Sequence, residues 1–93
     1  MNVMIIGGGG REHALAERLA RSPRVETLYA LPGNGGIAAL AECVPIPATD
    51  LDALVAFARE RSIDFAVVAP DDPLVMGLVD RLEAAGVRDA ALS

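Results

Sequence analysis

The segment from Asn2 to His13, NVMIIGGGGREH, constrains the fold of this chain more than any other part of it. Its apolar run Val3–Ile6 predicts a buried parallel strand, the glycines Gly7–Gly10 predict a tight turn, and Arg11 predicts the start of a helix. Glycine tolerates positive φ and close approach to a ligand, while the N–H groups and positive dipole at a helix start attract anions. We interpret the segment as a phosphate-binding loop. The alternative is a strand-to-helix turn that binds no ligand.

Helix and strand patterns alternate along the rest of the chain. The predicted elements are a helix at Arg11–Arg21, a strand at Val25–Leu31, a glycine-rich turn at Pro32–Gly36, a helical turn at Ile37–Glu42, a strand at Cys43–Ile46, a helix ending near Arg61, a strand at Ile63–Ala69 and a helix ending at Gly86. Thr49 and Asp52 have the spacing of a capping box, and Asp72 followed by Pro73 suits a second helix start. The tail Val87–Ser93 has few large apolar residues, which predicts a weak edge strand or a frayed end.

This alternation predicts an α/β fold over residues 1–93, namely a Rossmann-like (pre-ATP-grasp) three-layer sandwich. We expect a parallel sheet of four to five strands with helices on both faces. In the first helix we expect Ala14, Leu15, Leu19 and Ala20 to share the inward face. Ligands of such sheets bind outside the carboxyl ends of the strands. Three loops are predicted at that edge: Gly7–His13, Pro32–Gly36 and Pro70–Pro73.

Composition and charge narrow the class of partner. The net charge is −5 and all basic residues are arginines, which disfavours binding to nucleic acid. The first 24 residues nevertheless carry a local charge of +2, which either favours an anionic small molecule or marks a solvated helix face. No apolar run reaches the ~18 residues of a membrane span, and no secretory leader is recognisable, so we expect a cytoplasmic protein without a membrane partner. Cys43 is the single cysteine, which argues against a metal cluster, and we expect a buried core thiol.

The glycine loop fits a dinucleotide poorly. Neither register of the G-x-G-x-x-G pattern places a small residue third, because Glu12 or His13 falls there, and Leu31 replaces the acidic residue that would bind the ribose. A nucleoside-triphosphate P-loop is excluded because the chain has no lysine. A small phosphorylated molecule fits the loop better.

Three motifs together resemble a known family. IIGGGGREHALA, LPGNGG and VVAPDDPLVMGLVD are similar, in order and spacing, to the amino-terminal domain of phosphoribosylamine–glycine ligase (glycinamide ribonucleotide synthetase) of purine biosynthesis. The resemblance runs from Met1 to about Gly86. It implies an ATP-grasp ligase in which ATP phosphorylates the glycine carboxylate and the amine of 5-phosphoribosylamine attacks the acyl phosphate.

The resemblance also implies a substrate site. On this likeness Gly8, Gly9, Gly10 and Arg11 would contact the sugar phosphate. Glu12, His13, Asn34 and Asp71 would be candidates for the ribose or the amine, with Pro32 and Gly33 in the same turn. No catalytic residue and no metal ligand is expected in this segment, and ATP with magnesium or manganese is implied for the full-length family.

The chain departs from the family pattern in two respects. Ala69-Pro70-Asp71 stands where the family has glycine-proline-glutamate, so a shorter carboxylate would have to reach the same partner. The family also continues into ATP-grasp and carboxyl-terminal domains, so we expect this chain to be a fragment. By itself it should catalyse no ligation, and ADP release above background would contradict that expectation. The isolated domain could also self-associate through a face that normally meets its sister domains.

Several alternatives stay open at this point. His13 either packs as a neutral side chain or contacts the ligand, and Glu12 either complements the helix dipole or contacts the ligand. Asn34 either adopts a left-handed turn conformation or contacts the ligand. The rival functions are a dinucleotide- or nucleotide-binding module of another enzyme and a non-catalytic interaction domain.

Overall fold

A computed structural model describes residues 1–7, 10–47, 49–68 and 75–91. Within these ranges nine elements follow one another. They are β1 (Asn2–Gly7), α1 (Gly10–Ala20), β2 (Thr27–Pro32), the 3₁₀ turn η1 (Ile37–Ala39), β3 (Glu42–Cys43), α2 (Leu51–Glu60), β4 (Phe65–Val68), α3 (Val75–Ala84) and β5 (Arg88–Ala91). The predicted alternation of strands and helices is confirmed. In the described residues no helix is long and apolar enough to cross a membrane.

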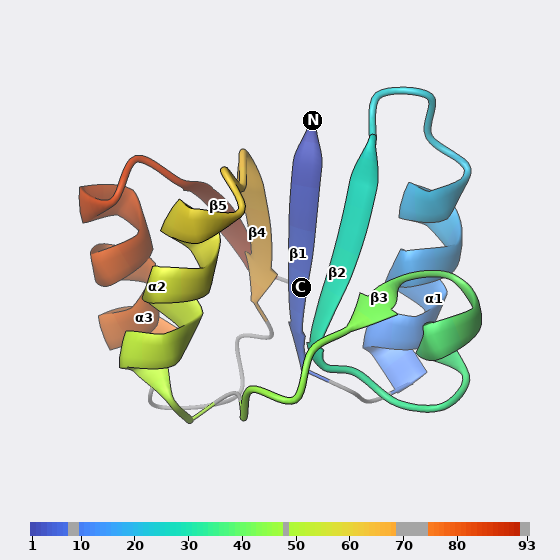
Figure 1. The fold of residues 1–93 in the computed structure, drawn as a ribbon, viewed down its shortest axis with the longest axis horizontal. Coiled ribbons are helices and arrows are strands. Elements are labelled where there is room, and N and C mark those ends of the chain that lie inside the picture. Colours follow the sequence, from blue (N-terminus) through green and yellow to red (C-terminus); the bar gives the residue numbers. More distant parts are fainter. Residues whose placement is uncertain (8–9, 48, 69–74, 92–93) are drawn as a thin grey trace.

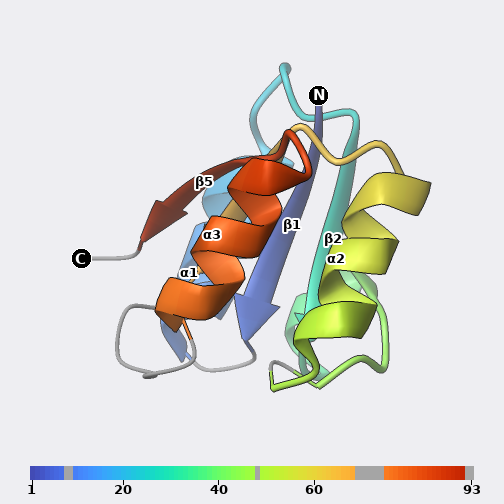
Figure 2. The ribbon, with the colours of Figure 1, turned by 90° about the vertical axis from the view of Figure 1, so that its left-hand side faces the viewer.

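The five strands form one parallel sheet in the order β3-β2-β1-β4-β5. The chain adds strands outward on one side of β1 and then returns to the other side of it, so the strand order reverses between β1 and β4. β5 is an edge strand, which is one of the two outcomes expected for the tail. Ligands of open α/β sheets bind at such a reversal, outside the carboxyl ends of the strands. That edge is at the bottom of Figure 1 and of Figure 2, where β1 points downward.

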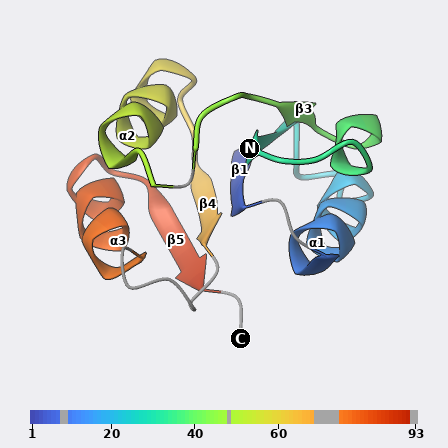
Figure 3. The ribbon, with the colours of Figure 1, turned by 90° about the horizontal axis from the view of Figure 1, so that it is seen from below.

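Helices cover both faces of the sheet, which confirms the predicted α/β sandwich. Alternate residues of β1 point to opposite faces: Val3 and Ile5 pack with α1 and η1, whereas Met4 and Ile6 pack with α2 and α3. Figure 3 shows α1 on one side of the sheet and the α2–α3 pair on the other. All four of these β1 side chains are buried, which explains why the strand reads as an unbroken apolar run.

The inward face of α1 differs from the prediction. Ala14 and Ala20 are exposed, whereas Glu12 and Ala16 are buried and Leu15 and Leu19 are partly buried. The buried positions 12 and 16 and the partly buried position 19 follow the i, i+4, i+7 spacing of one helix stripe, of which the prediction included only Leu19.

The start of α2 also differs from the prediction. Thr49 is not the cap. The helix begins at Leu51, its N-cap is Asp50, and the Asp50 side chain accepts a hydrogen bond from the Ala53 N–H at 3.2 Å. Asp50 therefore stands three residues before the N–H that it satisfies, which is the spacing the cap requires. The third strand is shorter and earlier than predicted, at Glu42–Cys43, while the predicted capping residues of α3 lie outside the described residues.

Candidate functional site

The first two glycine-rich loops lie side by side at the carboxyl edge of the sheet. β1 ends at Gly7 and β2 ends at Pro32, and these two residues are partners in the strand register. One residue later, the Gly33 N–H donates to the Gly7 carbonyl at 3.2 Å. Gly8, Gly9 and Asp71, which the sequence also places at this edge, lie outside the described residues, as does the whole third loop, Pro70–Pro73.

Glu12 occupies the space beside Gly7. Gly7 has φ of 132°, and a Cβ atom there would lie 3.0 Å from Glu12 Cγ and closer still to Glu12 Oε1. Glu12 is 8% exposed and is the charged residue that the described structure buries. Glycine at position 7 is therefore required by its backbone conformation and by the side chain that fills the space a Cβ would take.

Gly33 has a comparable role in the second loop. Its φ is 73°, and a Cβ atom there would lie 2.5 Å from Cys43 Sγ and 3.1 Å from the Ala30 side chain. The Cys43 thiol in turn donates to the Asn34 carbonyl at 3.6 Å. Cys43 is partly buried and contacts the loop, so it differs from the buried core thiol that was expected. The strand β3 thus supports the backbone of the second loop from beneath.

Asn34 stabilises η1. Its Oδ1 accepts from the Ile37 N–H and its backbone carbonyl accepts from the Ala38 N–H, both at 2.9 Å. Ser62 is the non-glycine residue with positive φ in the described chain, so the suggestion that Asn34 adopts a left-handed conformation is wrong. The asparagine is explained by its side-chain acceptor at the start of a 3₁₀ turn.

His13 connects α1 to the second loop. A Cβ atom at Gly36 would lie 2.9 Å from His13 Cε1 and 3.3 Å from Nδ1, so the imidazole rests against the Gly36 backbone. Its Nε2 lies 3.9 Å from Glu17 Oε1, one helical turn further on. The side chain keeps 41% of its surface exposed, and the ring therefore packs against the loop at the rim without being sealed inside the protein.

Gly10 and Arg11 open α1 at the same edge, and both are exposed. The first N–H groups of a helix have no carbonyl partner within it, and its dipole places partial positive charge there. Arg11, an exposed residue, adds a full positive charge in the first turn of the helix, whereas Glu12 adds a negative charge on a buried residue. This edge of the sheet therefore carries an exposed cationic residue, Arg11, and a buried carboxylate, that of Glu12.

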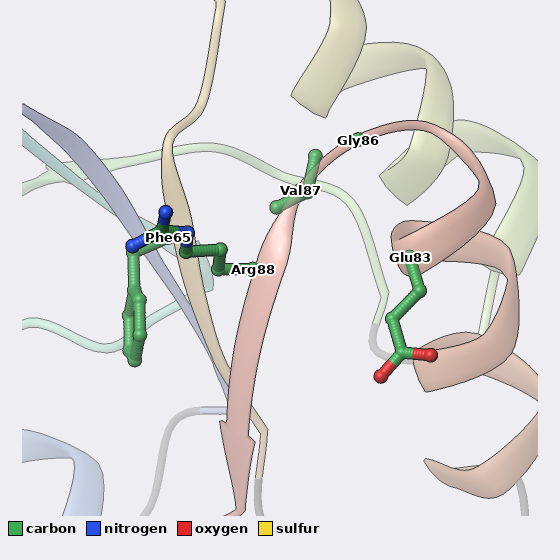
Figure 4. Close-up of a pocket in the computed structure, with 5 residues that line it drawn as sticks. All are labelled: Phe65, Glu83, Gly86, Val87 and Arg88. Carbon is green, nitrogen blue, oxygen red and sulfur yellow. The ribbon is translucent and has the colours of Figure 1, made fainter.

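Two hollows of the described surface lie away from the glycine loops. One of about 500 Å³ is lined by Phe65, Glu83, Gly86, Val87 and Arg88, at the amino-terminal ends of β4 and β5 (Figure 4). Another shares Phe65, Gly86 and Arg88 and extends to Met1 and Glu26. Both are at the opposite edge of the sheet from the glycine loops, and neither includes a predicted site residue. Within the described residues no three His, Cys, Asp or Glu side chains are grouped closely enough to hold a metal ion.

Comparison with known families identifies the family of this chain. Residues 1–91 match the family model described as phosphoribosylglycinamide synthetase, N domain. The chain belongs to this family. The resemblance drawn from the three sequence motifs is thereby confirmed, and the match covers every described residue of the N domain.

Curated relatives agree with the family assignment. The N domain is 54% identical over 87 residues to a phosphoribosylamine–glycine ligase of Agrobacterium fabrum, covering 94% of this chain and 21% of that protein. It is 56% identical over 88 residues to the protein of the same name from Brucella melitensis and 48% identical over 88 residues to that of Caldanaerobacter subterraneus, in both cases covering 95% of this chain and 21% of the relative. The chain spans about a fifth of the length of these relatives.

Sequence reasoning found the loops of the N domain but missed how side chains support them. The burial of Glu12, the contact of Cys43 with the second loop and the packing of His13 on Gly36 all join residues from different elements. One signal was available: Glu12 is the third residue of α1, the position at which an acidic side chain can turn back toward the helix start.

Proposed function

We propose that this N domain binds 5-phosphoribosylamine for an ATP-dependent ligase that joins it to glycine in purine biosynthesis. The observation that carries the proposal is the match of residues 1–91 to the family, together with relatives named phosphoribosylamine–glycine ligase. The structure supports it by bringing two glycine-rich loops together at the carboxyl edge, where ligands of this fold class bind.

In this proposal the start of α1 binds the phosphate. Gly10 and Arg11 present N–H groups and an exposed cation, and Gly8 and Gly9 complete the loop by sequence. Pro32 and Gly33 form the neighbouring wall. His13 and Asn34 make contacts within the protein that hold the second loop in place, so we assign them a positioning role beside any contact with the ligand. Asp71 remains a candidate for the ribose or the amine.

The remaining chemistry belongs to the rest of such a ligase. We propose that ATP, its magnesium or manganese ion and glycine are bound by segments corresponding to the other four-fifths of the relatives' length. Cytoplasm is the compartment we propose, in keeping with the purine-pathway role.

A titration followed by NMR tests the proposed site. Ribose 5-phosphate, which carries a hydroxyl in place of the amine, should shift the amide signals of Gly10, Arg11, Gly35 and Gly36 saturably. The signals of Gly86 and Arg88, at the opposite edge, should stay unchanged. Replacing Arg11 with alanine should weaken binding about three- to tenfold, because a charge-assisted contact to phosphate is lost.

Arg21→Ala is the matched control. Arg21 is also exposed, but it follows the far end of α1, so its removal changes the net charge equally without touching the proposed site. Equal weakening of binding by both variants would show that the loss comes from the change in net charge and not from a contact between Arg11 and the phosphate. Saturable shifts around Gly86 with none at Gly10 would overturn the proposed location.

A further inference from the structure

The Glu12 carboxylate is the one buried charge of the described structure and has no hydrogen bond to another described residue. The same part of the chain contains no side-chain oxygen or nitrogen that is sealed from solvent without a hydrogen-bond partner, so the carboxylate oxygens still reach solvent. A carboxylate that is mostly desolvated and lacks a donor is unfavourable. Such a group favours a ligand that supplies the donor.

The position of Glu12 determines which part of a ligand could supply it. The side chain turns from the first turn of α1 onto the backbone of Gly7, where β1 ends and the glycine loop begins. Gly7 is also hydrogen-bonded to Gly33 of the second loop. The carboxylate therefore lies on the buried side of this edge, against the end of β1, whereas Gly10 and Arg11 are exposed.

The positive charge of Arg11 and the negative charge of Glu12 together favour a ligand that carries both an anionic group and a hydrogen-bond donor. A bare anion is attracted by the helix start and by Arg11 but repelled by Glu12. A phosphorylated sugar can place its phosphate at the helix start and turn an amine or hydroxyl toward the carboxylate. Resting on the proposed function, we propose that Glu12 accepts a hydrogen bond from the amine or hydroxyl of the sugar and so makes the rim select a phosphosugar over a bare phosphate.

A structural role for Glu12 is the competing explanation. A carboxylate in the first turn complements the helix dipole, and this one also fills the space beside Gly7. Both effects would stabilise the fold, but neither would make binding depend on the donor group of a ligand. The ratio of two affinities separates the explanations, because a purely structural change at the loop affects both ligands alike.

The test compares ribose 5-phosphate with inorganic phosphate on the 93-residue chain by calorimetric titration. The wild type should bind the sugar phosphate more tightly. Glu12→Gln should reduce that preference about three- to tenfold, because a hydrogen bond to a charged acceptor becomes one to a neutral acceptor, while the affinity for inorganic phosphate holds or rises. Glu17→Gln removes the same charge from an exposed site one turn further along α1 and should leave the preference unchanged.

The outcomes are distinguishable. An unchanged preference in Glu12→Gln, or an equal loss of both affinities, overturns the inference while the proposed phosphosugar site stands. If the wild type binds neither ligand, the proposed function itself fails and the inference fails with it. If thermal melting shows that Glu12→Gln does not fold, Glu12→Asp decides instead: it keeps the charge but withdraws it by one methylene, so a reduced preference supports the inference and an unchanged one overturns it.

Discussion

At the scale of single residues, the glycine loops are shaped by side chains from other elements. Gly7, Gly33 and Gly36 each stand where a Cβ atom would meet a side chain, from Glu12, Cys43 and His13 respectively. Gly10 and Gly35 have open space at the Cβ position. Glycines that look equivalent in the sequence therefore divide into those that the packing requires and those that it does not.

Gly33→Ala should destabilise the domain by about 2–3 kcal/mol. The positive φ of Gly33 is unfavourable for alanine, and the new methyl would overlap the Cys43 sulfur. Gly35→Ala, two residues away in the same loop, is the matched control and should change the free energy of unfolding by less than about 0.5 kcal/mol. Urea unfolding of both variants measures the difference, and equal losses would contradict the assignment of strain to position 33.

At the scale of elements, the start of α2 differs from the start that the sequence motif predicts. Thr49 and Asp52 offered the more familiar pattern, but α2 begins one residue later than that pattern requires. Asp50 caps it, and Asp52 instead pairs with Arg81, joining α2 to α3 across the surface. Both are exposed side chains, so the ion pair adds little stability while the cap acts directly on helix formation.

Asp50→Ala should lower the free energy of unfolding by about 1 kcal/mol, because the Ala53 N–H loses its acceptor. Thr49→Ala should change it by less than about 0.5 kcal/mol. Circular dichroism during thermal unfolding gives both values. A larger loss of stability from Thr49→Ala than from Asp50→Ala would indicate that Thr49 caps the helix, as expected from the sequence.

At the scale of the whole molecule, the sheet divides the core into two clusters of unequal size. The larger cluster lies beneath α2 and α3 and contains Leu54, Leu78 and Leu82, together with the edge-to-face pair of Tyr29 and Phe57, whose centroids are 5.0 Å apart. The smaller one lies beneath α1 and η1. In the described residues Met1 is the large apolar side chain that is exposed. Self-association of the domain stays a prediction.

Leu54→Ala should cost about 2–5 kcal/mol, because Leu54 is 0% exposed and its removal leaves a cavity between α2 and the sheet. The loss is a large part of the roughly 5–14 kcal/mol expected for 93 residues at typical stability per residue. Leu51→Ala, on the same helix but only partly buried, should cost clearly less. Urea unfolding compares the two, and a reversed order would show that the larger cluster is not the main support of the fold.

Much of this protein was predictable from its sequence because the relevant patterns are local. The apolar run Val3–Ile6, the glycines that follow it and the alternation of periodicities determined an α/β sandwich with a parallel sheet. The order of elements along the chain placed the loops after Gly7 and Leu31 at a common edge. Three motifs in fixed spacing sufficed for the family, since each is a short contiguous string whose recognition needs no knowledge of distant contacts.

Only the tertiary structure decided what the side chains at that edge do. Glu12 was ambiguous as long as its environment was unknown, and its burial beside Gly7 depends on the packing of α1 against β1. The same holds for Cys43 beneath Gly33 and for His13 against Gly36, pairs separated by 10 and by 23 positions in the sequence. Periodicity reports which face of its own element a residue occupies. It carries no information on which distant residue lies opposite, because that is set by how the elements pack.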